Sequence, residues 1–506
     1  MKKIDDFWDQ QSKFVFLISV ILMIIAHGFC FMNLMYSHDS LKFYETSGID
    51  KIALGRWLYP LFVHVRQIAT PWMMGILSTI YVAIAVVLVT KILDFNKLQS
   101  VCVAMLFSSS ITLTALFCTY IFDADADCMA MLLACFAVYA FKSFPNGINI
   151  ITSSTAIMFC LALYQAYICL TIGLFIAFLI IKSKEIKNWE DVLRVFIIGL
   201  KEILTIILSI IMYISMMHLV ANHYGVRLST KYNGAGKLSS LTFDTVLKAI
   251  PEAYSYFRDT FFNVTGYNRQ SMVYVYYFMV FVLLLSFVVY IRTNKPFIGA
   301  IIIIIPCIIL MPLALNAIFL VSFGAIHQLM IFAFCLVLLL PFIFTNITAE
   351  PVSYGRKIVN CIAALSISFI CFNNIVYSNG AYTYKKLVYD NTALNAQTIW
   401  KDVNSTKGYT NGVTPVVLMG EFGSSRAAYN SSVGDRFNDA LTGASKSSMT
   451  YHKSVRKYFY GILGRDMKLK YNDPNIRRNK KYIDMPAYPS KGYCEMINGK
   501  VVVKLN

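Results

Sequence analysis

Uncharged, apolar stretches of about 20 residues recur along the chain and alternate with polar segments. A helix of that length crosses the hydrocarbon core of a bilayer, so each stretch predicts a membrane-spanning helix. Block 148–182 is too long for one helix and divides at Tyr164-Gln165-Ala166-Tyr167, and block 296–345 holds only His327 and Gln328 as strongly polar breaks. The eleven predicted spans are 14–34, 71–90, 101–121, 127–141, 148–164, 167–182, 203–220, 271–291, 296–316, 325–345 and 357–377.

The composition favours the same class of protein. Of the 506 residues, 57% are hydrophobic and 14% are charged, whereas soluble domains have about 45–50% and about 25%. A soluble protein of this size cannot bury so much apolar surface, and the same composition excludes disordered, collagen-like and coiled-coil chains. Eleven of the twelve cysteines lie in or beside apolar stretches and only Cys494 lies in the polar tail, so the pattern predicts no disulfide framework.

The distribution of basic residues between loops predicts the orientation. The first apolar run is longer than the roughly 7–15 residues of a cleaved signal peptide, so we interpret it as a retained anchor. With the amino terminus in the cytoplasm, the inner loops are short and richer in Lys and Arg, as the positive-inside rule requires. Eleven spans then place the tail outside, together with the long loops 35–70 and 221–270 and the short acidic loop 122–126. Long segments on one side indicate that the protein works on that side.

The tail has the mixed pattern of a small α+β domain. Segment 414–420 reads as a buried strand followed by a glycine turn, 453–463 has helical spacing, and 500–505 reads as a terminal strand. The predicted fold is therefore an all-α polytopic membrane bundle with a small extracytoplasmic α+β domain. We divide the chain into a transmembrane catalytic domain at 1–378 and a soluble domain at 379–506.

Much of the positive charge belongs to this tail. The whole chain carries a net charge of +18, and residues 380–506 contain 20 Lys and Arg against 9 Asp and Glu, a net +11. Beside a membrane, such an excess favours anionic lipid or polyanionic glycan as the partner. Nucleic acid is disfavoured because the sequence has no zinc-ligand spacing, no basic helix and no RNA-binding signature.

Two acidic motifs lie at predicted outer ends of spans. Asp39 follows the first span in Tyr36-Ser-His-Asp39-Ser, and Asp123, Asp125 and Asp127 alternate in Phe122-Asp-Ala-Asp-Ala-Asp-Cys128. Carboxylates at a membrane edge are costly to desolvate, and those that face the protein interior are usually functional. They suit a sugar hydroxyl, a divalent cation or the role of general base. The alternatives are a solvated acidic turn that caps the next helix and, for Asp39, an ordinary loop residue.

Three further groups of residues can bind substrate. In Leu54-Gly-Arg56-Trp57-Leu-Tyr59-Pro60, Arg56 can grip a phosphate, while Trp57 and Tyr59 can stack on a sugar; the alternative is a membrane-surface helix with aromatic anchors. Tyr164 and Gln165 can hydrogen-bond a hydroxylated ligand, or act only as polar contacts between helices. His327 can contact phosphate or sugar, or be a packed core histidine.

The sequence lacks the motifs of other enzyme classes. It contains no Walker A motif, no G-x-S-x-G, no H-E-x-x-H, no C-x-x-C and no dinucleotide fingerprint. A nucleotide-driven or cytosolic metabolic enzyme is therefore disfavoured.

Layout and motifs together resemble the GT-C class of lipid-linked-sugar glycosyltransferases. More narrowly, the chain is similar to bacterial Gtr type-II glucosyltransferases, which modify O-antigens and related surface glycans. The residues that carry the resemblance are the two acidic motifs and Gly55-Arg56-Trp57, with Leu163-Tyr-Gln-Ala-Tyr167 and, in the tail, Met485-Pro-Ala-Tyr-Pro489 and Val501-Val-Val-Lys-Leu505.

The resemblance implies a multi-pass protein of the bacterial inner membrane that transfers a hexose, commonly glucose, from a polyprenyl-phosphate donor to an extracytoplasmic glycan. It also implies that Asp39 is the catalytic base and that Asp123 and Asp125 form the second acidic motif. Asp127, Arg56, Trp57, Tyr59, Tyr164, Gln165 and His327 are the predicted substrate contacts. A divalent cation is required in only some members, so the use of a metal stays open. The competing functions are a transporter or flippase for a lipid-linked or anionic solute, and a non-catalytic scaffold whose tail binds wall polymer.

Overall fold

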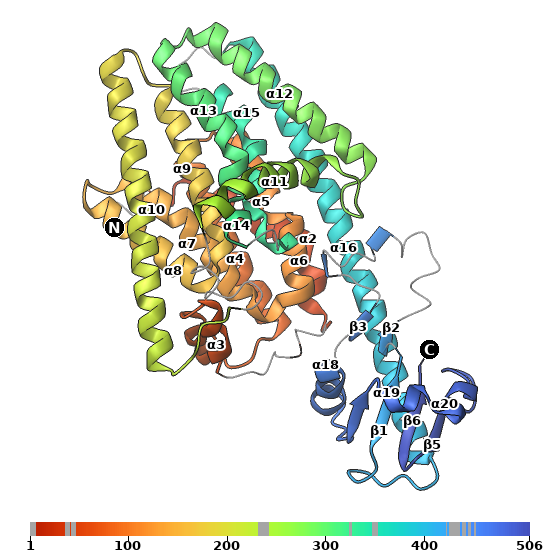
Figure 1. Cartoon of the computed structure of the whole chain (residues 1–506). Helices are drawn as coiled ribbons and strands as arrows, with labels where there is room; N and C mark the ends of the chain where they lie inside the picture. Colours follow the sequence, from red (N-terminus) through yellow and green to blue (C-terminus); the bar gives the residue numbers. More distant parts are fainter. Residues whose placement is uncertain are drawn as a thin grey trace.

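The computed structural model of the chain describes residues 7–35, 41, 47–230, 242–322, 326–346, 353–420, 422–424, 436–437, 442–443, 447–449 and 452–505. Helices dominate it, and a small sheet lies near the carboxyl terminus (Figure 1). The α-helices before the tail are α2 (Gln10–Met32), α3 (Tyr59–Arg66), α4 (Pro71–Ile92), α5 (Lys97–Ser108), α6 (Ile111–Tyr120), α7 (Ala124–Ser143), α8 (Ile148–Leu163), α9 (Ile168–Ser183), α10 (Trp189–His223), α11 (Phe243–Phe262), α12 (Gln270–Asn294), α13 (Ile298–Leu315), α14 (Ala317–Ser322), α15 (Leu340–Thr345) and α16 (Tyr354–Ser405). Short 3-10 helices are η2 (Ile49–Leu54), η3 (Ile121–Asp123), η4 (Gln165–Tyr167), η6 (Gln328–Met330) and η7 (Phe332–Leu339).

Within the described residues, eight helices are long and apolar enough to cross a membrane. Two shorter apolar helices, Ile148–Leu163 and Phe332–Thr345, fall on two further predicted spans. The chain is therefore a multi-pass membrane protein by the length and composition of its helices. The total of eleven spans, and which side of the membrane each loop faces, stay predictions.

Two predicted spans differ from the helices observed. Segment 101–121 is not one helix, because α5 ends at Ser108 and α6 begins at Ile111. The interruption has a local cause: the Ser110 side chain accepts a hydrogen bond from Thr112 N and caps a new helix. Segment 325–345 is largely 3-10 helix, followed by the short α15. By contrast, the predicted break at Tyr164-Gln165-Ala166-Tyr167 is confirmed by η4, which separates α8 from α9.

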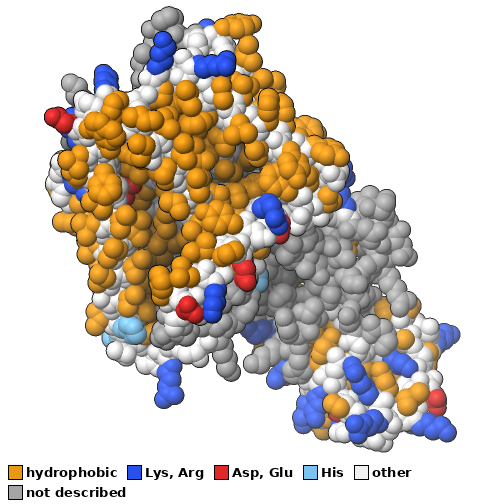
Figure 2. Space-filling view, turned by 45° about the horizontal axis from the view of Figure 1, so that its top comes forward, with side chains coloured by type: hydrophobic (Ala, Val, Ile, Leu, Met, Phe, Trp, Pro, Cys, Tyr) orange, Lys and Arg blue, Asp and Glu red, His pale blue; other side chains and the backbone are white. Residues whose placement is uncertain are grey.

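Tight helix packing forms the core of the bundle. The helix α7 lies at its centre, packed against α4, α8 and α9, and α2 packs against α4 and α5. The outer helices α10, α12 and α13 instead expose many large apolar side chains, as expected of surfaces that face lipid. Figure 2 shows this apolar surface over one face of the bundle, with Lys and Arg side chains at its margins and on the small domain.

The 52-residue helix α16 connects the bundle to the tail. At 1.5 Å per residue its length is about 78 Å, against about 30 Å for the hydrocarbon core. The helix therefore projects beyond the bundle, and the small domain surrounds its far end (Figure 1). The boundary that we predicted between 378 and 379 falls inside this continuous helix, and the division into two domains stays a prediction.

Four strands form the main sheet of the tail, in the order β4-β1-β6-β5. The strand β1 (Val416–Met419) runs parallel to β4 (Leu469–Tyr471) and β6 (Lys500–Lys504), and β5 (Cys494–Ile497) forms an antiparallel hairpin with β6. The strands predicted in 414–420 and 500–505 are thus confirmed, and the helical spacing in 453–463 becomes α18 (His452–Lys457) followed by a π-helix at Tyr458–Ile462. The remaining elements are β2 (Phe422–Ser424), β3 (Ser447–Met449), α19 (Pro474–Arg477) and α20 (Lys480–Asp484).

Different elements pack against the two faces of the sheet. Val416 and Leu418 pack with the end of α16, whereas Val417 and Met419 pack with Ile476 and Met485 on the other face. This alternation is the two-residue period of a strand, and burial on both faces explains why β1 is a continuous apolar run.

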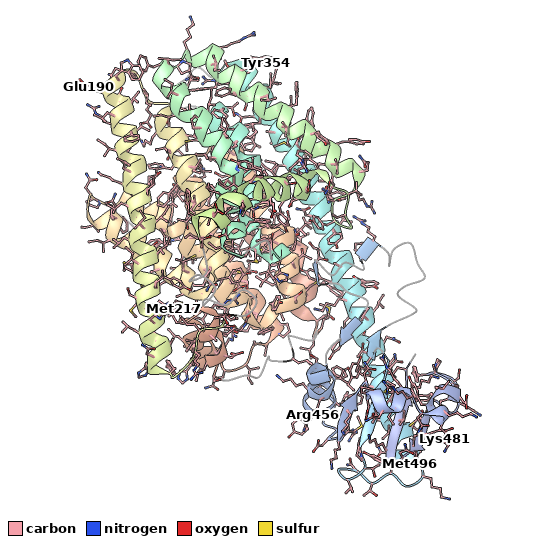
Figure 3. All side chains as sticks on the ribbon, viewed as in Figure 1. Glu190, Met217, Tyr354, Arg456, Lys481 and Met496 are labelled. Carbon is pink, nitrogen blue, oxygen red and sulfur yellow. The ribbon has the colours of Figure 1, made fainter. Side chains whose placement is uncertain are left out.

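The bundle has two distinct ends. Glu190 at the start of α10 and Tyr354 at the start of α16 lie at one end, and Arg456, Lys481 and Met496 of the tail lie beyond the other (Figure 3). The short helix α3 belongs to the end that faces the tail (Figure 1). The helix α3 and the small domain therefore share one end of the molecule.

Gly75 of α4 allows a close approach of α2. A Cβ atom at this position would lie 2.3 Å from the ring of Phe31, so we expect Gly75→Ala to destabilise the protein by about 1–3 kcal/mol through overpacking. The measurement is the loss of the monodisperse peak in detergent after stepwise heating. Gly355→Ala is the matched control, because nothing lies within 4 Å of a Cβ there; equal loss in both variants would contradict this packing argument.

Candidate functional site

Helical geometry divides the acids at the start of α7 between two directions. Residues 123 and 127 are four positions apart and share a helix face, whereas residue 125 points to the opposite side. All three carboxylates are buried, with relative exposures of 1% for Asp123, 2% for Asp125 and 3% for Asp127. Buried carboxylates need cationic or hydrogen-bonding partners, and the segment between α2 and α4 supplies them.

Asp123 is the centre of the cluster. It forms an ion pair with Lys51 through Oδ2 and accepts a hydrogen bond from the Tyr59 hydroxyl through Oδ1. An Arg56 guanidinium nitrogen lies 3.9 Å from Oδ2. Both partner segments are held by local turns: Gly55, with φ +83°, directly follows η2, and Pro60 lies in the first turn of α3.

Asp125 has a separate partner. It pairs with Arg66 at the end of α3, and Arg66 also donates to the Tyr59 hydroxyl at 2.9 Å. Tyr59 thereby links the Asp123 and Asp125 pairs. Burial, together with the charge of Asp123, raises the pKa of Tyr59, so its hydroxyl remains a proton donor at neutral pH.

Arg56 lies against an aromatic ring and between two acids. Its guanidinium carbon is 4.4 Å from the centre of the Tyr164 ring, a cation–π contact. Burial alone would lower the pKa of Arg56, but the charges of Asp127 and Asp123 raise it, so the guanidinium stays charged. Among the described residues, Arg56 Nε and Asp127 Oδ1 are buried atoms without a hydrogen-bond partner, and such atoms mark places where a ligand or water can bind.

Hydrogen bonds from two side chains of the bundle hold the loop that contains Arg56. The Gln165 side-chain amide donates to Leu54 O at 2.8 Å and to the Tyr213 hydroxyl at 3.0 Å. The Tyr213 hydroxyl in turn donates to Gly55 O at 3.1 Å. Gln165 and Tyr213 therefore fix the backbone of the two residues that precede Arg56, which makes them positioning residues.

The cations are more accessible than the acids. The side chains of Lys51 and Arg56 are 12% and 17% exposed, against 2% for Asp123 between them. An incoming ligand would therefore meet positive charge first. A phosphate group of a ligand can bind Lys51 and Arg56 in addition to the Asp123 carboxylate that already contacts them. Charge-assisted hydrogen bonds from Lys and Arg are the strongest that a protein offers to phosphate.

The predicted site residues fall into three groups. Asp123, Asp125, Asp127, Arg56, Tyr59, Tyr164 and Gln165 lie together in or beside this cluster. Trp57 follows Arg56 but is buried against Phe159, with ring centres 6.1 Å apart, and is not open for stacking on a sugar. His327 precedes η6, which packs against α6, and it is not among the cluster residues. Asp39 lies outside the described residues.

Three members of the site were not predicted from the sequence: Lys51, Arg66 and Tyr213. Charge balance is the signal that could have found two of them, because three buried acids require cations and the segment 35–70 contains Lys51 and Arg66 in addition to Arg56. Tyr213 lies within an apolar span and gives no such signal.

Two of the three carboxylates, Asp123 and Asp125, form ion pairs with Lys and Arg side chains. Across the parts of the chain that are described, no group of three or more His, Cys, Asp and Glu side chains is arranged to hold a metal ion. In this geometry the acids orient Lys51, Arg56 and Arg66.

Comparison with known protein families gives a match over most of the bundle. A family model described as glucosyl transferase GtrII matches residues 28–346, a segment that contains the whole cluster. No curated protein and no solved structure matches the chain.

Proposed function

Because the chain belongs to the glucosyl transferase GtrII family, we propose that it transfers glucose from a polyprenyl-phosphate donor to an extracytoplasmic surface glycan. The observation that carries this proposal is the partly exposed pair of cations, Lys51 and Arg56, over buried acids inside the matched segment.

The surface beside the cluster supports a lipid-linked donor. Along α3, Tyr59, Val63 and Arg66 face the protein, while Leu61 and Val65 on the other face are 55% and 76% exposed. The start of α4 continues this apolar surface with Trp72 and Met73, both exposed. An isoprenoid chain can lie against such a surface while its phosphate reaches the neighbouring cations.

In the proposed reaction, Asp39 acts as the base. Its carboxylate takes the proton of an acceptor hydroxyl, and the resulting oxygen attacks the anomeric carbon of glucose. The bond from that carbon to the phosphate oxygen breaks, and the polyprenyl phosphate leaves with the electron pair. Arg56 and Lys51 stabilise the negative charge that develops on the leaving phosphate, as preorganised cations do in phosphate chemistry. A single displacement of this kind inverts the anomeric configuration.

The proposal includes the location of the reaction. The protein would lie in the bacterial inner membrane with the cluster on the extracytoplasmic side, where the phosphate of a lipid-linked sugar sits at the membrane edge. The small domain lies beyond the same end of the bundle as α3 (Figure 1), so it would share the compartment of the acceptor.

Compositional analysis of the surface glycan tests the function. We expect cells that express the chain to carry glucose branches that are absent from an isogenic strain without it, as measured by glycan hydrolysis and mass spectrometry. An unchanged glycan in cells that hold the protein in their membranes would reject a glucosyltransferase acting on that glycan. Movement of the lipid-linked sugar across vesicles without any transfer product would instead support a flippase.

A further inference from the structure

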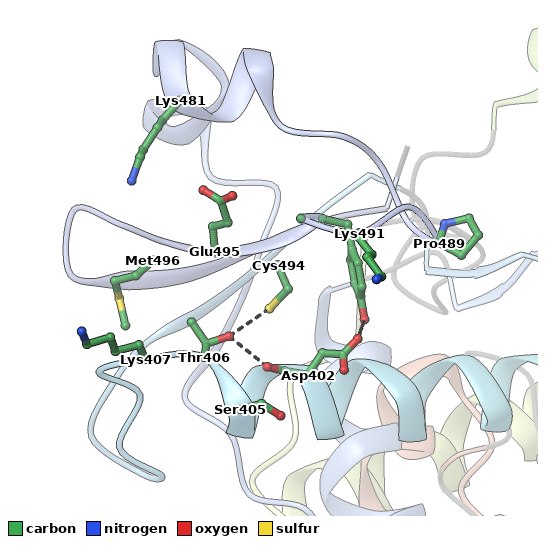
Figure 4. A pocket seen from close by; sticks show the side chains of 12 residues that line it. Asp402, Ser405, Thr406, Lys407, Lys481, Pro489, Lys491, Cys494, Glu495 and Met496 are labelled. Atoms are coloured by element: carbon green, nitrogen blue, oxygen red, sulfur yellow. Dashed lines mark hydrogen bonds between the residues drawn. The ribbon is translucent and has the colours of Figure 1, made fainter.

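A polar cleft lies in the small domain, separate from the acid–cation cluster. Its volume is about 560 Å³, and it opens between the end of α16, α20 and β5. In Figure 4, Lys481 comes from α20 on one side, Asp402 and Lys407 come from the end of α16 and the residues after it on the other, and Glu495 of β5 lies between them. Lys491 and Tyr493 also line the cleft.

Hydrogen bonds fix the floor of this cleft. The Tyr493 hydroxyl donates to Asp402 Oδ2 at 2.6 Å, and the Thr406 hydroxyl donates to Asp402 O at 2.9 Å. Thr406 Oγ1 also lies 3.4 Å from Cys494 Sγ, which ties the helix end to β5. The cleft is therefore bounded by the end of α16, by α20 and by β5, together with Pro489, Lys491 and Gly492 of the segment that connects α20 to β5.

The charges of the lining define the ligand. Lys407, Lys481 and Lys491 are exposed, and in the part of the chain that is described none of the three has an ion-pair partner. Asp402 and Glu495 beside them can accept hydrogen bonds from hydroxyl groups. Small-molecule sites are mostly apolar and enclosed, whereas this open cleft, with amines beside carboxylates, suits a hydrated saccharide that carries phosphate or carboxylate groups.

The cleft is far from the acid–cation cluster. The bundle contacts α16 where Thr114 Oγ1 and Ser378 Oγ lie 2.6 Å apart, and Asp402 lies about 36 Å further along the helix axis. Asp123 follows Thr114 by only nine residues of helix, about 14 Å if fully aligned with that axis. At least about 20 Å along this axis separates the two sites, so one glycan that engages both must span several sugar units. The same distance from the bundle favours a glycan over a lipid surface.

We propose that this cleft binds a distal stretch of an anionic polysaccharide, and that it holds the polymeric acceptor while a nearer hydroxyl reacts at the cluster. This inference rests on the proposed function for the role of the glycan, but not for the binding itself.

The test is a binding measurement with the full-length protein in lipid nanodiscs. The probe is a fluorescein-labelled oligogalacturonate of defined length, with a neutral malto-oligosaccharide of equal length as the comparison, and the readout is fluorescence polarisation. The cleft variant is Lys407→Glu with Lys481→Glu and Lys491→Glu. The matched control is Lys457→Glu with Lys468→Glu and Lys470→Glu, which changes the net charge equally around α18 and β4, at the opposite edge of the sheet.

We expect the cleft variant to bind the anionic probe at least tenfold more weakly, the control to stay within twofold of wild type, and the neutral probe to bind poorly to all three. A triple Lys→Gln variant at the cleft positions should show the same loss if the glutamate variant elutes abnormally from a sizing column. Equal weakening in the cleft and control variants, or equal binding of the neutral probe, would overturn the proposal. So would binding of phosphatidylglycerol vesicles that only the cleft variant loses, because the cleft would then be a membrane contact.

The two proposals fail separately. Probe binding needs no sugar transfer, so a protein that binds the probe through the cleft but transfers no glucose would reject the proposed function and retain the binding site. Transfer to a short acceptor without any cleft-dependent binding would reject only the cleft.

Discussion

Replacing Asp39 by asparagine is expected to lower the rate of glucosyl transfer by about 10²–10⁴-fold, the usual contribution of a general base. Asparagine has nearly the same shape but cannot take the proton of the acceptor hydroxyl. The measurement is the initial rate of glucose incorporation into acceptor glycan in membranes that contain equal amounts of each protein. Because only the base is removed, the apparent affinity for the lipid donor should change much less than the rate.

Asp50→Asn is the control for this variant. Asp50 is an exposed acid of the same loop, and we place it neither in the cluster nor in the reaction, so it should retain the wild-type rate. Full activity of Asp39→Asn at normal protein levels would remove the assignment of Asp39 as the base.

Asp123→Asn is expected to abolish transfer and to destabilise the protein by about 3–5 kcal/mol, the cost of breaking a buried ion pair. The change leaves Lys51 and Arg56 facing a neutral amide whose N–H groups repel them, and the Tyr59 hydroxyl keeps only a weaker acceptor. Transfer rate and thermal stability in detergent are the two measurements. Asp94→Asn is the matched control. Asp94 forms an ion pair with Lys142, but its side chain is 55% exposed, and an ion pair exposed to solvent contributes at most about 1 kcal/mol to stability.

A second variant separates a structural role of Asp123 from a functional one. Adding Lys51→Met to Asp123→Asn removes the unpaired ammonium and should recover part of the lost stability. Transfer should stay at background, because the double variant lacks a cation that binds the donor phosphate. Recovery of both stability and transfer would show that the pair only supports the fold.

The helices were predictable because hydrophobic length is a local property of the sequence. Apolar runs gave the helices of the bundle, and the apolar segment 414–420 gave β1. The errors have local causes too: the helix break at Ser109 and Ser110 depends on one hydroxyl that caps α6, a competition that the apolar pattern of 101–121 conceals.

The site was predictable only in part. Alternating acids at the predicted outer end of a span were visible in the sequence, and so was Arg56 beside Gly55. Their partners were not, because the pairing of Asp123 with Lys51 and of Asp125 with Arg66 depends on how η2 and α3 dock on α7. For Trp57 the prediction itself was wrong. Its ring is of a type that can stack on a sugar, but in the structure it packs against Phe159.

The central claim is that the protein takes glucose from a lipid phosphate and passes it to a glycan. It is tested most directly with purified protein in proteoliposomes that contain acceptor glycan and either polyprenyl-phosphate-[¹⁴C]glucose or UDP-[¹⁴C]glucose. We predict labelled glycan only with the lipid-linked donor, and background label with Asp39→Asn. Labelled glycan from UDP-glucose in the absence of any polyprenyl phosphate, or lipid-linked label that crosses the bilayer without reaching the glycan, would contradict the account.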